Sequence, residues 1–146
     1  MEISVVVPVH NEEGNIIPLH QELCDVLRNI EVEFEIVFVN DGSTDQSINI
    51  IKELATQHSY IKYLDFSKNF GHQLSVFAGL EYATGNYIVI IDADLQDPPA
   101  LIKNLYHKIK EGYDVVYAQR TYRKDETWLK LFTAKSFYRF INQMSD

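Results

Sequence analysis

The feature that most constrains the fold is an apolar run that ends abruptly in carboxylates. Residues 87–91 are one tyrosine and four β-branched residues, and Asp92 and Asp94 follow directly. A short continuous run of this kind is typical of a strand buried on both faces of a parallel sheet. Pro98 and Pro99 then stop the strand and can begin a helix. The carboxylates therefore lie just past the carboxyl end of a central strand, where open α/β sheets bind ligands.

The rest of the chain alternates strand and helix patterns. Apolar runs predict further strands, at residues 3–9, 34–41, 60–65 and 112–118. Apolar residues at helical spacing predict helices, at residues 12–29, 45–58, 72–83 and 101–111. Such alternation indicates βαβ units in a doubly wound, mostly parallel α/β sheet with helices on both faces. A length of 146 residues suits one domain, so we expect residues 1–146 to form a single α/β domain.

The amino-acid composition limits the compartments in which this chain could act and the kinds of partner it could bind. The one cysteine, Cys24, excludes an intrachain disulfide and fits a reducing compartment. No apolar run approaches the length of a membrane span, and the N-terminus lacks the pattern of a signal peptide, so we expect this segment to be soluble and cytoplasmic. The net charge of −8 argues against nucleic-acid binding. The charge is uneven, because residues 118–146 carry six Lys or Arg residues and three acids.

The turn after the first strand argues against two common nucleotide-binding motifs. Residues 8–14 read Pro-Val-His-Asn-Glu-Glu-Gly, with one glycine and two carboxylates where a dinucleotide-binding turn has Gly-x-Gly-x-x-Gly. A P-loop is also absent from the sequence. A phosphatase with an aspartate nucleophile would need its aspartate pair after the first strand rather than the fourth.

Acidic residues recur at the ends of three strands. They are Glu12 and Glu13, which follow Asn11 after the first strand, Asp41 after the second, and Asp92 and Asp94 after the fourth. If the strand order is 3-2-1-4, these ends open onto one crevice with an acidic floor. A base and a ribose offer N–H and hydroxyl donors that carboxylates accept. A diphosphate could enter only with a bridging divalent cation.

Three segments together resemble a known family. Residues 5–13, 39–45 and 92–99 look like the motifs of family 2 glycosyltransferases of the GT-A fold. With residues 69–73, the match resembles the polyprenyl-phosphate branch, to which dolichol-phosphate mannose synthases and undecaprenyl-phosphate glycosyltransferases belong. The similarity covers essentially the whole chain. It implies an inverting, metal-dependent transfer of a sugar from a nucleotide-sugar, UDP- or GDP-linked, to a membrane polyprenyl phosphate.

The resemblance also implies which residues bind the nucleoside. Pro8, Val9 and Glu12 would line its pocket, and Asp41 would accept a hydrogen bond from the base. Asp41 has a structural alternative, because it could cap the following helix together with Asp45.

A second group of residues would bind the diphosphate and its metal ion. The resemblance implies that Asp92 faces the ribose and metal-bound waters, while Asp94 and Gln96 hold Mg²⁺ or Mn²⁺. Arg120 would lie near phosphate groups, so that Asp92, Asp94 and Arg120 are the candidate catalytic residues. We expect His72, at a helix start, to be a structural hydrogen-bonding residue.

The sequence carries fewer indications about the acceptor than about the donor. In the family that the chain resembles, the catalytic domain usually continues for a further segment, and the polyprenyl members then add membrane helices. The resemblance therefore implies that this chain is a truncated, donor-binding part. The intact protein would then lie at the cytoplasmic side of the plasma membrane. Residues 127–141 are amphipathic and basic, which fits either a membrane-surface helix or a core-facing helix. A transferase that extends a polysaccharide, and a non-catalytic nucleotide-binding module, remain alternatives, and the sequence indicates no oligomeric state.

Overall fold

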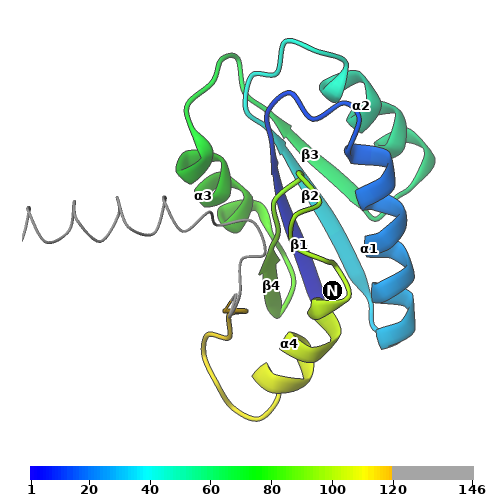
Figure 1. The fold of residues 1–146 in the computed structure, drawn as a ribbon, viewed down its shortest axis with the longest axis vertical. Coiled ribbons are helices and arrows are strands. Elements are labelled where there is room, and N and C mark those ends of the chain that lie inside the picture. The colour runs from blue at the N-terminus through cyan, green and yellow to red at the C-terminus, as the bar shows by residue number, and fades with distance from the viewer. Residues whose placement is uncertain (120–146) are drawn as a thin grey trace, which may run out of the picture. The chain divides into compact units, whose positions relative to one another are not determined.

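Four parallel strands form the sheet that organises the described part of the chain. The computed structural model describes residues 1–119, with strands β1 (Ile3–Val9), β2 (Phe34–Asn40), β3 (Ile61–Asp65) and β4 (Tyr87–Ile90). Their order is β3-β2-β1-β4, and every neighbouring pair is parallel (Figure 1). This is the order that brings the acidic strand ends together, and β1 lies at the centre of that group.

Helices cover both faces of the sheet, as a doubly wound fold requires. They are α1 (Ile16–Ile30), α2 (Ser47–Gln57), α3 (His72–Tyr82) and α4 (Leu101–Ile109). Alternate residues of β1 point to opposite faces, so Val5 and Val7 join the core under α1, α2 and α4. Val6 points to the other face, where α3 packs against β1 and β2 (Figure 1). The predicted mostly parallel, doubly wound α/β architecture is therefore confirmed.

The first helix begins later than its apolar spacing predicts. The helical pattern starts near Glu12, but α1 begins at Ile16. Asn11 has φ 58°, in the left-handed region, and the backbone N–H of Glu12 donates to Ser47 Oγ at 2.9 Å. The residues before α1 thus form a turn that binds the start of α2 instead of a first helical turn.

The prediction of a fifth strand is wrong for the residues that the structure describes. Residues 112–119 contain no strand, and the side chain of Val115 is 77% exposed. Valine and tyrosine favour strands because they pack on a half-buried sheet surface, and that burial is missing here. Among residues 1–119, β4 pairs only with β1, and Ile88 and Ile90 on its α3 side are exposed.

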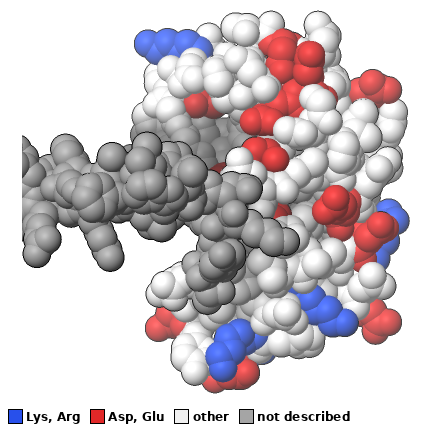
Figure 2. All heavy atoms as spheres, viewed as in Figure 1, with Lys and Arg blue, Asp and Glu red and all other residues white. Residues whose placement is uncertain are grey.

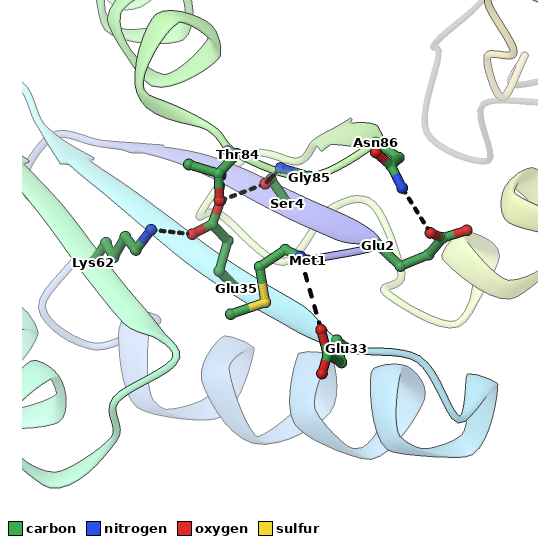
Figure 3. Close-up of polar contacts among 9 residues, drawn as sticks. All are labelled: Met1, Glu2, Ser4, Glu33, Glu35, Lys62, Thr84, Gly85 and Asn86. Carbon is green, nitrogen blue, oxygen red and sulfur yellow. Dashed lines mark hydrogen bonds and ion pairs between the residues drawn. The ribbon is translucent and has the colours of Figure 1, made fainter.

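Buried polar contacts tie the end of α3 to the sheet (Figure 3). Glu35 on β2 is 0% exposed, and its Oε1 accepts hydrogen bonds from Ser4 Oγ at 2.6 Å and Thr84 N at 2.7 Å. Lys62 Nζ lies 2.5 Å from the other carboxylate oxygen. Burial alone would raise the pKa of Glu35, but the bonds from Lys62, Ser4 and Thr84 outweigh it and lower the pKa to about 2. A charged carboxylate therefore holds the connection between α3 and β4.

Two sequence predictions fall on residues that the structure does not describe. Arg120 and the amphipathic segment 127–141 both lie outside residues 1–119. Within residues 1–119, each helix is too short or too polar to cross a membrane.

Candidate functional site

A pocket of about 340 Å³ opens at the carboxyl ends of the strands. Its volume is in the range of small-molecule sites. Acidic side chains gather on this end of the molecule (Figure 2). The lining comes from β1 and the turn after it, from the ends of β2 and β4, and from the start of α3 and the turn before it: Pro8, Val9, His10, Glu12, Asp41, Asn69, Gly71, His72, Ser75, Asp92, Ala93 and Asp94.

Most of the residues predicted from the sequence meet in this pocket. Those that line it are Pro8, Val9, Glu12, Asp41, Asp92 and Asp94. Gln96 is not among the lining residues, and its backbone N–H donates to Asp94 Oδ1 at 3.0 Å. The strand order explains this convergence, because the ends of β2, β1 and β4 are neighbours along one edge of the sheet.

The carboxylate of Asp41 accepts hydrogen bonds from the turn before α3. Asp41 is 3% exposed, and its two oxygens accept backbone N–H groups, Phe70 at 2.7 Å and Gly71 at 2.9 Å. At the start of α2 it is Asp45 that accepts, from the N–H of Ser47 at 2.9 Å. Among the hydrogen bonds of the described residues, Asp41 therefore does not cap α2. Each of its carboxylate oxygens accepts one N–H group and has a second lone pair, which can accept a hydrogen bond from a ligand.

Asp92 and Asp94 form the other acidic group of the pocket. The side chain of Asp92 is 51% exposed, and its Oδ1 lies 3.8 Å from Nε2 of His72. In residues 1–119, no group of three or more His, Cys, Asp or Glu side chains could hold a metal ion by itself. The carboxylates of Asp92 and Asp94, which both line the pocket, nevertheless fit a hard divalent cation that takes its other ligands from water and substrate phosphates.

Sequence reasoning missed the contribution of the turn before α3 and of the first turn of that helix. Asn69, Gly71, His72 and Ser75 all line the pocket. The signal for them was present, because the polar turn 69–72 follows a parallel strand and so opens at the same edge of the sheet. His72, which we expected to be a structural hydrogen-bonding residue, lines the pocket, and its Nε2 lies 3.8 Å from Asp92 Oδ1.

His10, at the end of β1, joins the same segment to β2. Its Nδ1 is 2.7 Å from the carbonyl oxygen of Asp41, which can only accept, so Nδ1 carries the proton. In the neutral imidazole Nε2 is then an acceptor, and the side-chain amide nitrogen of Asn69 lies 3.2 Å from it. Neither partner of His10 could be assigned from the sequence, because the contacts join residues that are far apart in the chain.

The loops that follow β1 and β2 are bonded to each other beside the pocket. Asn11 Oδ1 accepts from the N–H of Thr44 at 2.8 Å. The N–H of Glu13 donates to Asp45 Oδ2 at 3.1 Å, and Glu13 Oε2 accepts from the N–H of Gln46 at 2.8 Å. Asn11 and Glu13 are not among the lining residues, and their bonds hold together the two loops that carry His10, Glu12 and Asp41.

The fold and the site together define a class of protein. Residues 4–145 match the family model described as "Glycosyl transferase family 2". The chain belongs to this family. Its parallel sheet with helices on both faces is that of the GT-A glycosyltransferases, as the resemblance of its motifs implied.

Curated relatives carry glycosyltransferase names. The chain is 51% identical over all of its length to "Uncharacterized glycosyltransferase YkcC" of Bacillus subtilis (strain 168), and it covers 45% of that protein. It is 41% identical over 99% of its length to "Bactoprenol glucosyl transferase" of Shigella phage SfV, of which it covers 47%. The chain thus spans about half the length of the curated relatives it matches.

Solved structures show the same fold. TarS 1–349 of S. aureus in complex with UDP-GlcNAc has a TM-score of 0.57 and 29% identity, over 73% of this chain and 32% of that one. The mannosyltransferase PcManGT of Pyrobaculum calidifontis, in complex with GDP-Man and Mn²⁺, has a TM-score of 0.56 and 26% identity, over 72% of this chain and 31% of that one.

Proposed function

We propose that this chain is the donor-binding part of an inverting glycosyltransferase that moves a sugar from a UDP- or GDP-sugar to a membrane polyprenyl phosphate. The observation that carries the proposal is that one pocket gathers Asp41, Asp92 and Asp94 from the ends of β2 and β4. A relative named bactoprenol glucosyl transferase supports the lipid acceptor, and neighbours holding UDP-GlcNAc or GDP-Man support the donor class.

The nucleoside would occupy the part of the pocket between β1 and β2. Pro8 and Val9 offer apolar contact there, and Glu12 and Asp41 offer carboxylate oxygens. Asp41 is held by two backbone N–H groups, so its free lone pairs have a fixed direction. Such a preorganised acceptor suits a base N–H, because little freedom is lost when the ligand binds.

The diphosphate would lie toward Asp92 and Asp94. We propose that these carboxylates, with the side chain of Gln96, hold Mg²⁺ or Mn²⁺ against the phosphates. When bound, the cation would neutralise the charge that grows on the leaving diphosphate. Arg120 stands near phosphate groups in this proposal, on the strength of the sequence alone.

The reaction needs little proton transfer from the protein. An oxygen of the acceptor phosphate attacks the anomeric carbon on the face opposite the leaving group. The bond between that carbon and the diphosphate oxygen breaks, its electron pair leaves with the nucleoside diphosphate, and the configuration inverts. An acceptor phosphate is already ionised at neutral pH, so a general base is dispensable. The intact protein would act at the cytoplasmic side of the plasma membrane, with basic residues after position 118 near the lipid phosphate.

A transfer assay with the full-length protein tests this proposal. Labelled UDP-glucose and GDP-mannose are offered with undecaprenyl phosphate in vesicles or with soluble sugars. We expect label in the extracted lipid, loss of this signal in Asp94→Asn, and a raised acceptor KM in Arg120→Ala. Asp25→Asn, the same change at an exposed position of α1, is the matched control. Transfer to soluble sugars alone would favour the polysaccharide alternative, and donor binding without any transfer would favour a binding module.

A further inference from the structure

The segment before α3 rests directly on the end of β2. Asp41 accepts the N–H groups of Phe70 and Gly71 with its two carboxylate oxygens. The next residue, Gly42, has φ +60°, and a Cβ atom there would lie 2.3 Å from the backbone carbon of Lys68. Two adjacent residues of one loop therefore fix the backbone of residues 68–71 by hydrogen bonds and by close contact.

Fixing this segment also fixes the first turn of α3. The carbonyl of Gly71, the residue before the helix, accepts the N–H groups of Leu74 at 3.1 Å and Ser75 at 3.2 Å. His72 follows directly, and its Nε2 lies 3.8 Å from Asp92 Oδ1. A continuous set of contacts thus runs from the carboxylate at the end of β2 to the carboxylate after β4.

We propose that Asp41 is a positioning residue that couples the two ends of the pocket, because its carboxylate orients the turn before α3 and thereby places His72 beside Asp92. This inference rests on the proposed donor site and deepens it. Asp41 then has two tasks. It accepts from the base, and it holds the helix that borders the diphosphate.

The two tasks make different predictions. If Asp41 served the base alone, its loss would weaken uridine and UDP by the same factor, and the gain in UDP affinity on adding Mn²⁺ would not change. If it also positions α3, that metal-dependent gain must fall. In Asp41→Asn, one acceptor oxygen becomes an NH₂ group that opposes the N–H of Phe70 or Gly71, so the turn is released.

A second variant separates the turn from the carboxylate. Gly71 has φ +98°, a conformation that side chains other than glycine rarely adopt, and a Cβ atom there would meet no atom within 4 Å. Gly71→Ala therefore strains the turn through its backbone while leaving the Asp41 side chain in place. It should reduce the metal-dependent gain for UDP, measured as the ratio of the affinities with Mn²⁺ and with chelator.

The experiment combines calorimetry with amide hydrogen exchange on the same samples. Uridine, guanosine, UDP and GDP are titrated with Mn²⁺ and with chelator into the wild type, Asp41→Asn and Gly71→Ala. Exchange is followed without ligand at the amides of Phe70 and Gly71. We expect these amides to exchange about tenfold faster in Asp41→Asn, the scale of one lost charge-assisted bond. Asp45→Asn, which makes the same chemical change at the start of α2, should leave them unchanged.

The outcomes separate this inference from the proposed function. If the wild type binds UDP or GDP but the metal-dependent gain is equal in wild type and both variants, the coupling role of Asp41 is overturned and the donor site stands. If the wild type binds neither nucleotide with Mn²⁺, the proposed donor site is refuted, and this inference is refuted with it. A reduced gain in both variants, with faster exchange at Phe70 and Gly71 in Asp41→Asn, supports the inference.

Discussion

The buried carboxylate of Glu35 makes the stability of the fold depend on pH in a calculable way. Its folded pKa is about 2, compared with 4.5 for a free carboxyl, so the unfolded chain binds this proton more readily. Stability from Glu35 is therefore complete well above pH 4.5 and is lost as the pH falls toward 2. A shift of this size corresponds to about 3 kcal/mol, of which about 2 kcal/mol is lost by pH 3.

Glu35→Gln isolates this contribution. The variant removes the charge beside Lys62 Nζ, 2.5 Å away, and places an amide where the Ser4 and Thr84 donors point. We expect it to lower the free energy of unfolding by about 3 kcal/mol at pH 7, the scale of a broken buried ion pair. The wild type should lose its advantage on acidification, because its own Glu35 carboxylate is then neutralised.

Urea unfolding of both proteins between pH 7 and pH 3 measures this difference. We expect the gap between wild type and Glu35→Gln to shrink by about 2 kcal/mol over that range. Glu22→Gln, at an exposed position of α1, controls for the general effect of losing one acid. A gap that stays constant from pH 7 to pH 3 would refute the reasoning, because the ionised carboxylate would then contribute nothing specific.

Three further changes test how the elements are packed. Gly79→Ala should destabilise the fold by about 1–3 kcal/mol in urea unfolding, since its Cβ would lie 2.3 Å from Val6 Cγ1 and push α3 off the sheet. Gly42→Ala should be destabilising and should also weaken UDP binding in calorimetry, because the contact at Lys68 is with rigid backbone. Burial, with smaller effects of nearby positive charge, lowers the pKa of His20, so the unfolded chain binds a proton more readily below pH 6.5. Stability should therefore fall on acidification through that range, and thermal unfolding of His20→Asn should lack this part of the fall.

The sequence predicted the features that topology controls. Parallel strands joined by helices must end at one edge of the sheet, so Asp41, Asp92 and Asp94 could be grouped before their positions were known. The order β3-β2-β1-β4 then brought them to one pocket together with Pro8 and Glu12. Apolar periodicity was sufficient for this because it determines which element each residue occupies.

The features that were missed depend on contacts between distant loops. The carboxylate of Asp41 binds amides 29 and 30 residues away, and no local pattern distinguishes that contact from a helix cap. The position of His72 depends on the same contact, because Asp41 orients the turn that directly precedes this residue. The prediction of a fifth strand was wrong for a related reason. The propensity of Val115 for strands has an effect only where a neighbouring strand pairs with it and its side chain is buried.

The most direct test of the central claim is the affinity of this chain for a nucleoside diphosphate with and without a divalent cation. UDP and GDP are titrated by calorimetry into wild type, Asp94→Asn and the control Asp25→Asn, with Mn²⁺ and again with chelator. The claim predicts that at least one nucleotide binds wild type and Asp25→Asn more tightly with Mn²⁺, and that Asp94→Asn loses this gain while keeping the metal-free affinity. Equal affinity of the wild type in Mn²⁺ and in chelator, or no binding of either nucleotide, would contradict it.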